Sequence, residues 1–245
     1  MYSKDGARAF DFNFMANVYE NDFQVIDCDF KDLPKASKQD IKLDNNLDGC
    51  RIGFDAGGSD RKVSAVVDGE VVFSDEVVWF PKINTDPQYH YDGILDSLKT
   101  AASHMPRVDS IGVSSAGIVV DNKMMEASLF IKVPEELRRS KAKNIYIDVA
   151  KEFGDIPLVV ANDGDVTALA GAMEIKDDCV LGIAMGTSEA GGYIGHGGIF
   201  LGWLNELAFV PIDYNEDAMV DEWSGDIGCG VKYFSQDGVI KLAGL

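Results

Sequence analysis

The spacing of apolar positions along the chain changes several times, and each change predicts a new element. Residues 92–104 place Ile94 and Leu98 on one face, as an amphipathic helix does. Short apolar runs predict strands, and Asp68-Gly69 between two of them tolerates the positive φ angles of a hairpin turn. Strands are predicted at 51–54, 63–67, 71–79, 110–114, 157–161, 179–185 and 191–195, and helices at 92–104, 144–153 and 165–173.

The order of these elements predicts an α/β fold. Strands that come first in hairpins and then alternate with helices are typical of a mixed sheet flanked by helices. Residues 1–49 differ, being rich in Asp, Asn and Lys, with Phe10, Phe12 and Phe14 alternating as in a strand. We interpret them as an extension that packs locally, as a hairpin or as an arm of a homodimer. The predicted division is an N-terminal extension at 1–49, a first lobe at 50–178 and a partial second lobe at 179–245.

The net charge of the chain disfavours some classes of binding partner. The chain has 22 Lys and Arg against 41 Asp and Glu, a formal charge of −19, which disfavours nucleic acids and membrane surfaces as partners. Small anions remain compatible, because backbone amides bind them locally. The four cysteines form no CxxC pair, and the sequence has neither a signal peptide nor a long apolar run. We therefore expect a cytoplasmic protein with reduced thiols.

The first glycine-rich turn, at 55–62, lies between two predicted strands. Two glycines let backbone amides approach a phosphate, a hydroxyl adds a donor, a basic side chain supplies charge and a carboxylate can hold Mg²⁺ through water. A plain glycine hairpin is the alternative interpretation. The residues concerned are Gly57, Gly58, Ser59, Arg61 or Lys62, and Asp55 for Mg²⁺.

A second turn with glycines and hydroxyls lies at 185–192 and includes Gly186, Thr187 and Gly191. Two such turns could hold a polyphosphate from both sides. Neither matches GxxxxGK[ST] or a strand–GxGxxG–helix unit, so the P-loop and the dinucleotide-binding motif are excluded.

Between these turns, an apolar strand ends at Asn162 and Asp163, and a helix is predicted from Asp165. A carboxylate at the C-terminal end of a strand is well placed to accept a proton from a substrate hydroxyl. Asx residues before a helix are more often N-caps. We expect Asp165 to be the cap, which leaves Asp163 for chemistry.

The order of these segments resembles the ROK family (repressors, open reading frames, kinases), sugar kinases of the actin-like ATPase superfamily. The resemblance runs from about residue 51 to 240. DAGGS at 55–59 is similar to the family string DxGGT, and IGVSSAG at 111–117 is similar to iGvxxpG. NDGDVTALAG at 162–171 is similar to NDANAAALGE. GTSEAGG at 186–192 is similar to GTGIGGG, and NELAF at 205–209 is similar to GEIGH.

The resemblance implies an actin-like ATPase (ribonuclease H-like) fold and a cytoplasmic kinase that uses ATP and Mg²⁺ to phosphorylate a hexose-like sugar. In such kinases the residue at Asp163 is the general base that accepts the hydroxyl proton. By the same resemblance, the sugar contacts are Asn162, Glu206, Ser115 and Gly117. The ATP phosphates lie against Asp55, Gly57, Gly58, Ser59, Lys62, Gly186, Thr187 and Gly191.

The chain departs from the family at its zinc site. Phe209 stands at the family's His ligand, and Glu222 and Ser224 stand at two of its cysteines, so that only Cys229 remains. A structural zinc needs four ligands, and we therefore expect no zinc here.

Other departures favour a second interpretation. Phe209 and Val231 replace two sugar contacts, and Glu189 adds a charge to the second turn that either repels phosphates or is solvated. The sequence ends at Leu245, which predicts an incomplete second lobe or an absent adenine pocket. The alternatives to a kinase are a non-catalytic sugar-binding or regulatory relative, and a fragment lacking the adenine pocket. The spacing of His90, His104 and His196 predicts no metal site, and we expect these side chains to be exposed or to cap helices.

Overall fold

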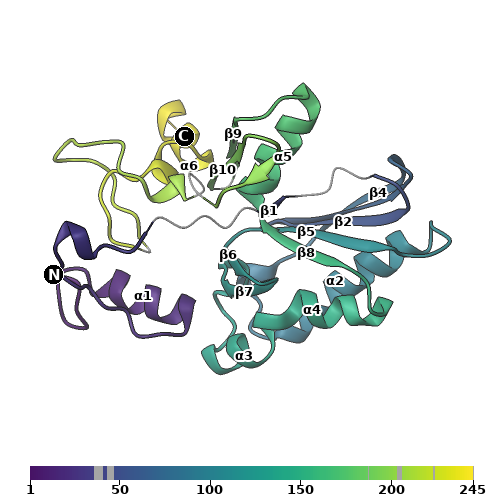
Figure 1. Ribbon diagram of the computed structural model, residues 1–245, viewed down its shortest axis with the longest axis horizontal. Helices are drawn as coiled ribbons and strands as arrows, with labels where there is room; N and C mark the ends of the chain where they lie inside the picture. Colours follow the sequence, from purple (N-terminus) through teal and green to yellow (C-terminus); the bar gives the residue numbers. More distant parts are fainter. Residues whose placement is uncertain (36–40, 43–46, 187, 203–205, 223, 245) are drawn as a thin grey trace.

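The structure, a computed structural model, describes residues 1–35, 41–42, 47–186, 188–202, 206–222 and 224–244. It confirms the predicted α/β class. Two main sheets lie in different halves of the molecule (Figure 1). Strands β6 (Ile118–Val120) and β7 (Lys123–Glu126) pair with each other and form a separate two-stranded ribbon. Among the described residues, no helix has the length and apolar character needed to cross a bilayer.

The larger sheet has the order β4-β3-β2-β5-β8, with antiparallel hairpins at one side and parallel strands at the other. Because β2, β5 and β8 are parallel, their C-terminal ends meet at one edge, where Asp55 pairs with Ser114 and Ser115 with Asn162. Its strands are β2 (Cys50–Ala56), β3 (Asp60–Val67), β4 (Glu70–Val78), β5 (Ser110–Ser115) and β8 (Leu158–Asn162).

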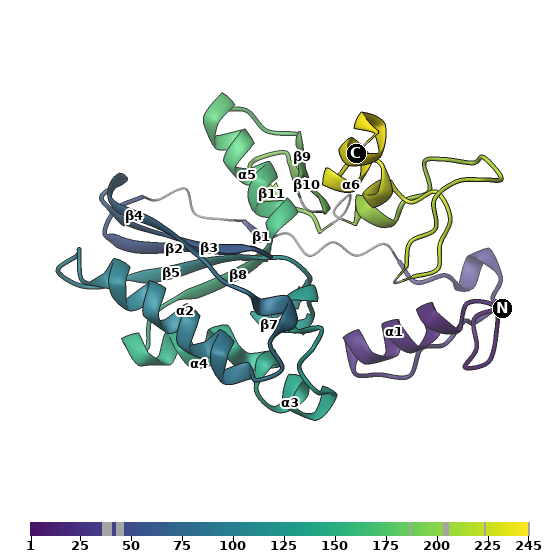
Figure 2. The ribbon, with the colours of Figure 1, turned by 180° about the vertical axis from the view of Figure 1, so that it is seen from behind.

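Helices α2 (Pro87–Ala102) and α4 (Ile145–Ala150) lie side by side against this sheet (Figure 2). Helix α3 (Glu135–Ser140), which precedes α4 in the chain, lies nearby. The α2 N-terminus is closed by Asp86, whose carboxylate accepts the Gln88 amide. His90 on α2 is fully buried and faces three backbone carbonyls, so the expectation of an exposed or capping histidine was wrong for this residue. The core is a large apolar cluster between helices and sheet.

The second sheet has the order β1-β11-β10-β9. Its strands are β1 (Ile41–Lys42), β9 (Val180–Met185), β10 (Glu189–Gly195) and β11 (Ile199–Phe200), and α5 (Asp163–Ile175) packs on it. A Cβ built on Gly164 of α5 would lie 2.2 Å from the Gly191 carbonyl oxygen, and one on Gly182 would lie 2.5 Å from Ala168 Cα. Gly191 is therefore a buried packing position in a strand; the interpretation of residues 185–192 as one turn was wrong.

The N-terminal segment is helical where a strand was expected. Phe10, Phe12 and Phe14 lie in α1 (Ala9–Tyr19), and Phe10 stacks on Phe14 with ring centroids 5.5 Å apart. Residues four apart are neighbours on a helix, so this pair stabilises the helical alternative that a short alternating pattern leaves open.

The N-terminal segment contacts distant parts of the chain as well. Glu20 pairs with Lys143 at 2.5 Å, Arg8 pairs with Asp226 at 2.6 Å, and β1 pairs with β11. The division at residues 49 and 178 stays a prediction, although α5, which that division places in the first lobe, packs on the second sheet. Helix α6 (Gln236–Ala243) lies near the C-terminus.

The tight contact between α5 and β10 makes a testable prediction. Gly164→Ala should reduce the free energy of unfolding by about 1–3 kcal/mol, because the added methyl group meets backbone that cannot move aside. Gly171→Ala, also in α5, meets only Val180 Cγ1 at 3.8 Å and should stabilise by about 0.5–1 kcal/mol through helix propensity. Urea unfolding of both variants measures the difference. Equal effects of the two substitutions would contradict the packing described here.

Candidate functional site

The candidate site lies where the parallel strands of the first sheet end and α5 begins. Asp163 is the first residue of α5, directly after β8, and Asp55 is close to the end of β2. Burial raises the pKa of the Asp163 carboxyl, the Gly164 amide opposes this by donating to it at 3.0 Å, and the negative charge of Asp55 raises it further. Such a carboxylate holds a proton more readily than an exposed one, as a general base requires.

The N-cap of α5 is Asn162, and the expectation that Asp165 caps this helix was wrong. Asn162 Oδ1 accepts the Gly164 amide at 2.8 Å, and its Nδ2 donates to the Gly117 carbonyl at 2.9 Å. Gly117 has φ +115°, and a Cβ there would lie 2.2 Å from the Glu126 carbonyl oxygen. The Asn162 amide is thus engaged at both ends, with one N–H remaining for a ligand.

Asp165 and Glu206 complete a group of acids around Asp163. Asp165 Oδ1 is buried and has no hydrogen-bond partner among the described residues, and burial followed by the Asp163 charge raises the Asp165 pKa to about 6. Glu206 keeps an exposed face, yet the protein around its carboxyl and the charges of Asp163 and Asp165 raise its pKa to about 7. These acids repel one another, and a cation or donated hydroxyl protons would relieve that repulsion.

Ser115 lies beneath this edge and supports it. The residue is fully buried, and its hydroxyl accepts a hydrogen bond from Tyr146 at 2.9 Å. Tyr146 is equally enclosed, and burial raises the pKa of its phenol. The Ser115 hydroxyl is therefore enclosed and already engaged by Tyr146, and its contact with a sugar stays a prediction.

At the first glycine turn, the expected side chains already have partners. Asp60 accepts both the Ser59 hydroxyl, at 2.9 Å, and the Lys62 ammonium, at 2.5 Å, which lowers the pKa of Asp60 and raises that of Lys62. The Arg61 guanidinium donates to Ser97 at 2.8 Å and faces α2.

A further cation, Lys82, lies against this turn at Gly58, and sequence reasoning missed it. A Cβ on Gly58 would lie 3.0 Å from Lys82 Nζ, and the neighbouring Gly57 carbonyl accepts the Trp79 indole N–H at 2.8 Å. Lys82 belongs to no motif and is distant from Gly58 in the sequence, so only the fold brings them together.

The second turn is shorter than expected, because β9 ends at Met185 and β10 begins at Glu189. The Gly186 carbonyl accepts the Gln236 amide at 2.9 Å, which places the start of α6 against the turn. Ser235, just before α6, is 3% exposed, and its hydroxyl has no partner among the described residues. Thr187, together with Trp203, Asn205 and Trp223, lies outside the described residues.

Glu189 at this turn is enclosed, so the alternative of a solvated charge was wrong. It is 8% exposed, and burial raises the pKa of its carboxyl. Its Oε2 has no partner among the described residues and would lie 2.4 Å from a Cβ on Gly230.

The residues that stand at the family's zinc-ligand positions have different surroundings in this structure. Cys229 is buried, whereas Glu222 pairs with Lys232 and the Ser224 hydroxyl donates to Asp221 at 2.9 Å. Burial raises the pKa of the Cys229 thiol, which disfavours the thiolate that a metal needs.

No protein-family model and no curated protein matches the sequence. Solved structures do match. A ROK hexokinase from Thermus thermophilus is 15% identical, with a TM-score of 0.59 over 79% of this chain and 62% of that one. An inorganic polyphosphate/ATP-glucomannokinase from Arthrobacter sp. strain KM is 20% identical, with a TM-score of 0.57 over 81% and 72%. A ROK family transcriptional regulator, a homologue of the E. coli MLC protein, is 18% identical, with a TM-score of 0.57 over 82% and 50%.

At these identities the comparisons establish the fold. The chain has the actin-like ATPase (ribonuclease H-like) fold that ROK kinases and a ROK regulator share, which confirms the fold expected from the motifs. The chain spans half of the regulator and 62% of the hexokinase.

The raised pKa values of Asp165 and Glu206 predict how stability depends on pH. The native state binds these protons more tightly than the unfolded chain, so this part of the stability is present at low pH and lost as the pH rises through about 6 to 7. Glu206→Gln should therefore become progressively more stable than the wild type between pH 4.5 and about 7.

Urea midpoints across this pH range test the effect. Asp60→Asn is the control, because Lys62 holds the Asp60 pKa below 3.8 and its removal should cost a constant amount over the same range. Parallel curves for the wild type and Glu206→Gln would contradict the repulsion between these acids.

Proposed function

We propose that the protein is an ATP-dependent sugar kinase of the ROK type that phosphorylates a hydroxyl of a hexose-like sugar. The observation that carries the proposal is the position of Asp163, a half-buried carboxylate of raised pKa where β8 meets α5, with Glu206 and Asp165 in the same electrostatic environment. No basic side chain among the described residues pairs with these acids, and such carboxylates suit a neutral ligand rich in hydroxyl donors.

The chain's own residues divide the work in the proposed reaction. Asp163 accepts the proton of the attacking hydroxyl and orients its oxygen. Asn162 fixes Asp163 by capping α5 and by holding the Gly117 carbonyl, which keeps the end of β8 beside β6. Glu206, where ionised, accepts hydrogen bonds from other sugar hydroxyls. Asn162 and Glu206 thus contribute by positioning Asp163 and the sugar, and positioning accounts for much of catalysis in phosphoryl transfer.

The two glycine turns offer features that fit a polyphosphate. At the first turn, Lys82 lies against Gly58, where a phosphate oxygen could receive both an amide and an ammonium. At the second, the start of α6 adjoins Gly186, and the Ser235 hydroxyl beside it has no partner within the described part of the chain. ATP would supply the transferred phosphoryl group.

Mg²⁺ fits the acidic side of the site, because it prefers oxygen ligands. Asp55 lies close enough to Asp163 for their negative charges to repel, and Asp165 Oδ1 has no hydrogen-bond partner among the described residues. The ion would neutralise the phosphates as charge develops.

One observation favours the alternative, a non-catalytic sugar-binding or regulatory relative. Glu189 places a buried carboxyl without a described partner at the second turn, where a nucleotide would bring negative charge. A protein of that kind would bind sugar with no phosphorylation, and the same fold occurs in a ROK transcriptional regulator.

Asp163→Asn tests the proposal directly. The substitution keeps the shape of the side chain and removes its basicity, so the rate of sugar phosphorylation should fall by about 10²–10⁴-fold while sugar affinity changes less than about tenfold. The assay is ADP release coupled to a panel of hexoses, and the control is Asp155→Asn, at an exposed acid that precedes the N-terminal end of β8 and lies outside the site. Sugar binding without turnover in the wild type would instead support the regulatory alternative. A fully active Asp163→Asn variant would refute the assigned base.

Lys82→Gln tests the first phosphate turn. Removal of the ammonium beside Gly58 should raise the dissociation constant for ATP by about tenfold and leave sugar affinity unchanged. The matched control is Lys99→Gln, at an exposed position on α2. Calorimetric titration with a non-hydrolysable ATP analogue measures both variants. Equal affinity in Lys82→Gln and the wild type would remove Lys82 from the site.

A further inference from the structure

Three side chains with metal-binding chemistry meet at the end of the second sheet opposite to its glycine turn. Asp178 and Cys179 come directly before β9, and His196 follows β10 directly. At this end of the β9–β10 hairpin, the last paired residues are Val180 and Ile194. Asp178 and Cys179 on one strand and His196 on the other lie just beyond that pair, and therefore side by side. The strand length separates them from Gly186 by about 20 Å, which makes this location distinct from the proposed kinase site.

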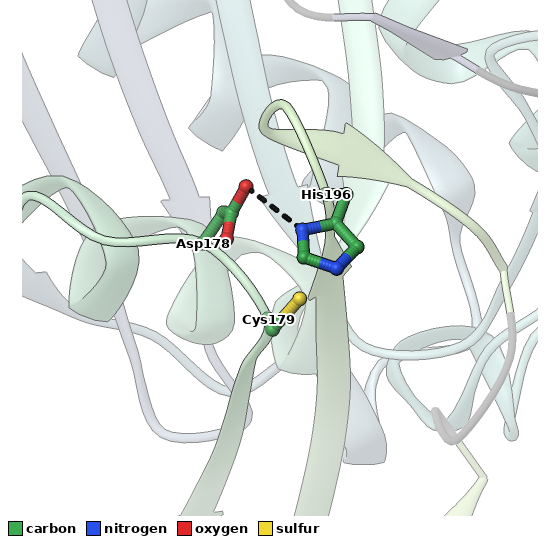
Figure 3. Close-up of side chains that lie close together, drawn as sticks. All are labelled: Asp178, Cys179 and His196. Atoms are coloured by element: carbon green, nitrogen blue, oxygen red, sulfur yellow. Dashed lines mark hydrogen bonds and ion pairs between the residues drawn. The ribbon is translucent and has the colours of Figure 1, made fainter.

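The side chains converge closely (Figure 3). Each contributes one potential ligand atom, and these atoms all lie within 4.8 Å of one another. Asp178 Oδ2 is 3.4 Å from His196 Nδ1 and accepts the Gly197 amide at 2.8 Å. This backbone hydrogen bond fixes the carboxylate in the way that outer-shell partners orient metal ligands.

The backbone at Cys179 explains how two adjacent residues face the same histidine. In an extended strand, neighbouring side chains point to opposite faces. Cys179 has φ +57°, in the left-handed region, and this interrupts the alternation just before β9 begins. A non-glycine residue in this conformation costs about 1–3 kcal/mol, and such strain is concentrated at functional sites.

The chemistry and the exposure of the cluster favour a metal cation. Thiolate sulfur, imidazole nitrogen and carboxylate oxygen are the ligand types of Zn²⁺ and similar ions. The Tyr193 hydroxyl contacts Cys179 from β10. The His196 side chain is 91% exposed, so an ion can enter and water can complete its coordination.

We propose that Asp178, Cys179 and His196 bind one divalent transition-metal ion of the zinc class, with a position left open to water. The site is separate from the string around Cys229, where no zinc is expected. The spacing of the histidines in the sequence did not indicate it, because Cys179 and His196 meet only through the β9–β10 hairpin.

Titration of the full chain with Co²⁺, followed by displacement with Zn²⁺, tests the site. Co²⁺ bound by a thiolate gives a charge-transfer absorption, and we expect this band to saturate at one ion per chain. Cys179→Ser should abolish the band. His196→Gln should weaken Co²⁺ binding by at least about tenfold. Cys28→Ser, at an exposed cysteine elsewhere, should change neither.

Three outcomes would overturn the proposal: no band in the wild type, a band that survives in Cys179→Ser, or a band lost in Cys28→Ser or in Cys229→Ser. Urea unfolding of each variant confirms that it is folded, and the exposed position of Cys179 and His196 makes large losses of stability unexpected. The readout is spectroscopic, so it stands whether or not the chain phosphorylates a sugar.

Discussion

The arrangement of the molecule depends on one amide side chain at the junction of its two sheets. Asn162 ends β8 in the first sheet, caps α5, which packs on the second sheet, and holds the Gly117 carbonyl beside it. An N-cap contributes about 1 kcal/mol to helix stability, but here it also fixes the direction in which α5 leaves the sheet. The position of Asp163 follows from that direction, since it is the next residue in the chain.

The close approach of α5 to β10 makes this junction rigid. Gly164 and Gly192 face each other across the interface, where a Cβ on Gly192 would lie 2.4 Å from the Gly164 carbonyl oxygen. Glycines that resemble a phosphate-binding string thus have a second physical role, which is to let a helix start directly against a strand. The same backbone carries Asp165, whose Oδ1 is buried without a described hydrogen-bond partner.

Much of the fold could be predicted because its signals are local. Apolar runs bounded by Gly and Asp identified the longer strands of both sheets, and the periodicity around Ile94 identified α2. The short strands β1 and β11 and the β6–β7 ribbon were not identified. The alternation of Phe10, Phe12 and Phe14 was misleading, since a short pattern of this kind also fits a helix whose aromatic rings pair four residues apart.

The candidate site was less predictable because it depends on contacts between distant segments. Asn162 and Asp165 are both good caps by residue type, and only the backbone geometry selects one of them. Lys82 reaches Gly58, and His196 reaches Cys179, through the fold alone. Residue type and order therefore identified candidate motifs for the site, whereas the partners of each side chain required the structure.

The central claim is that the acids around Asp163 form a site for a hydroxyl-rich ligand. The most direct test is a carbon-13 NMR titration of the Glu206 carboxyl, assigned with Glu206→Gln, in the presence and absence of saturating hexose. The account predicts a pKa of about 7 in the free protein, which falls when sugar hydroxyls donate to the carboxylate and stabilise its charged form. A pKa near the ordinary 4.5, unchanged by every hexose tested, would contradict it.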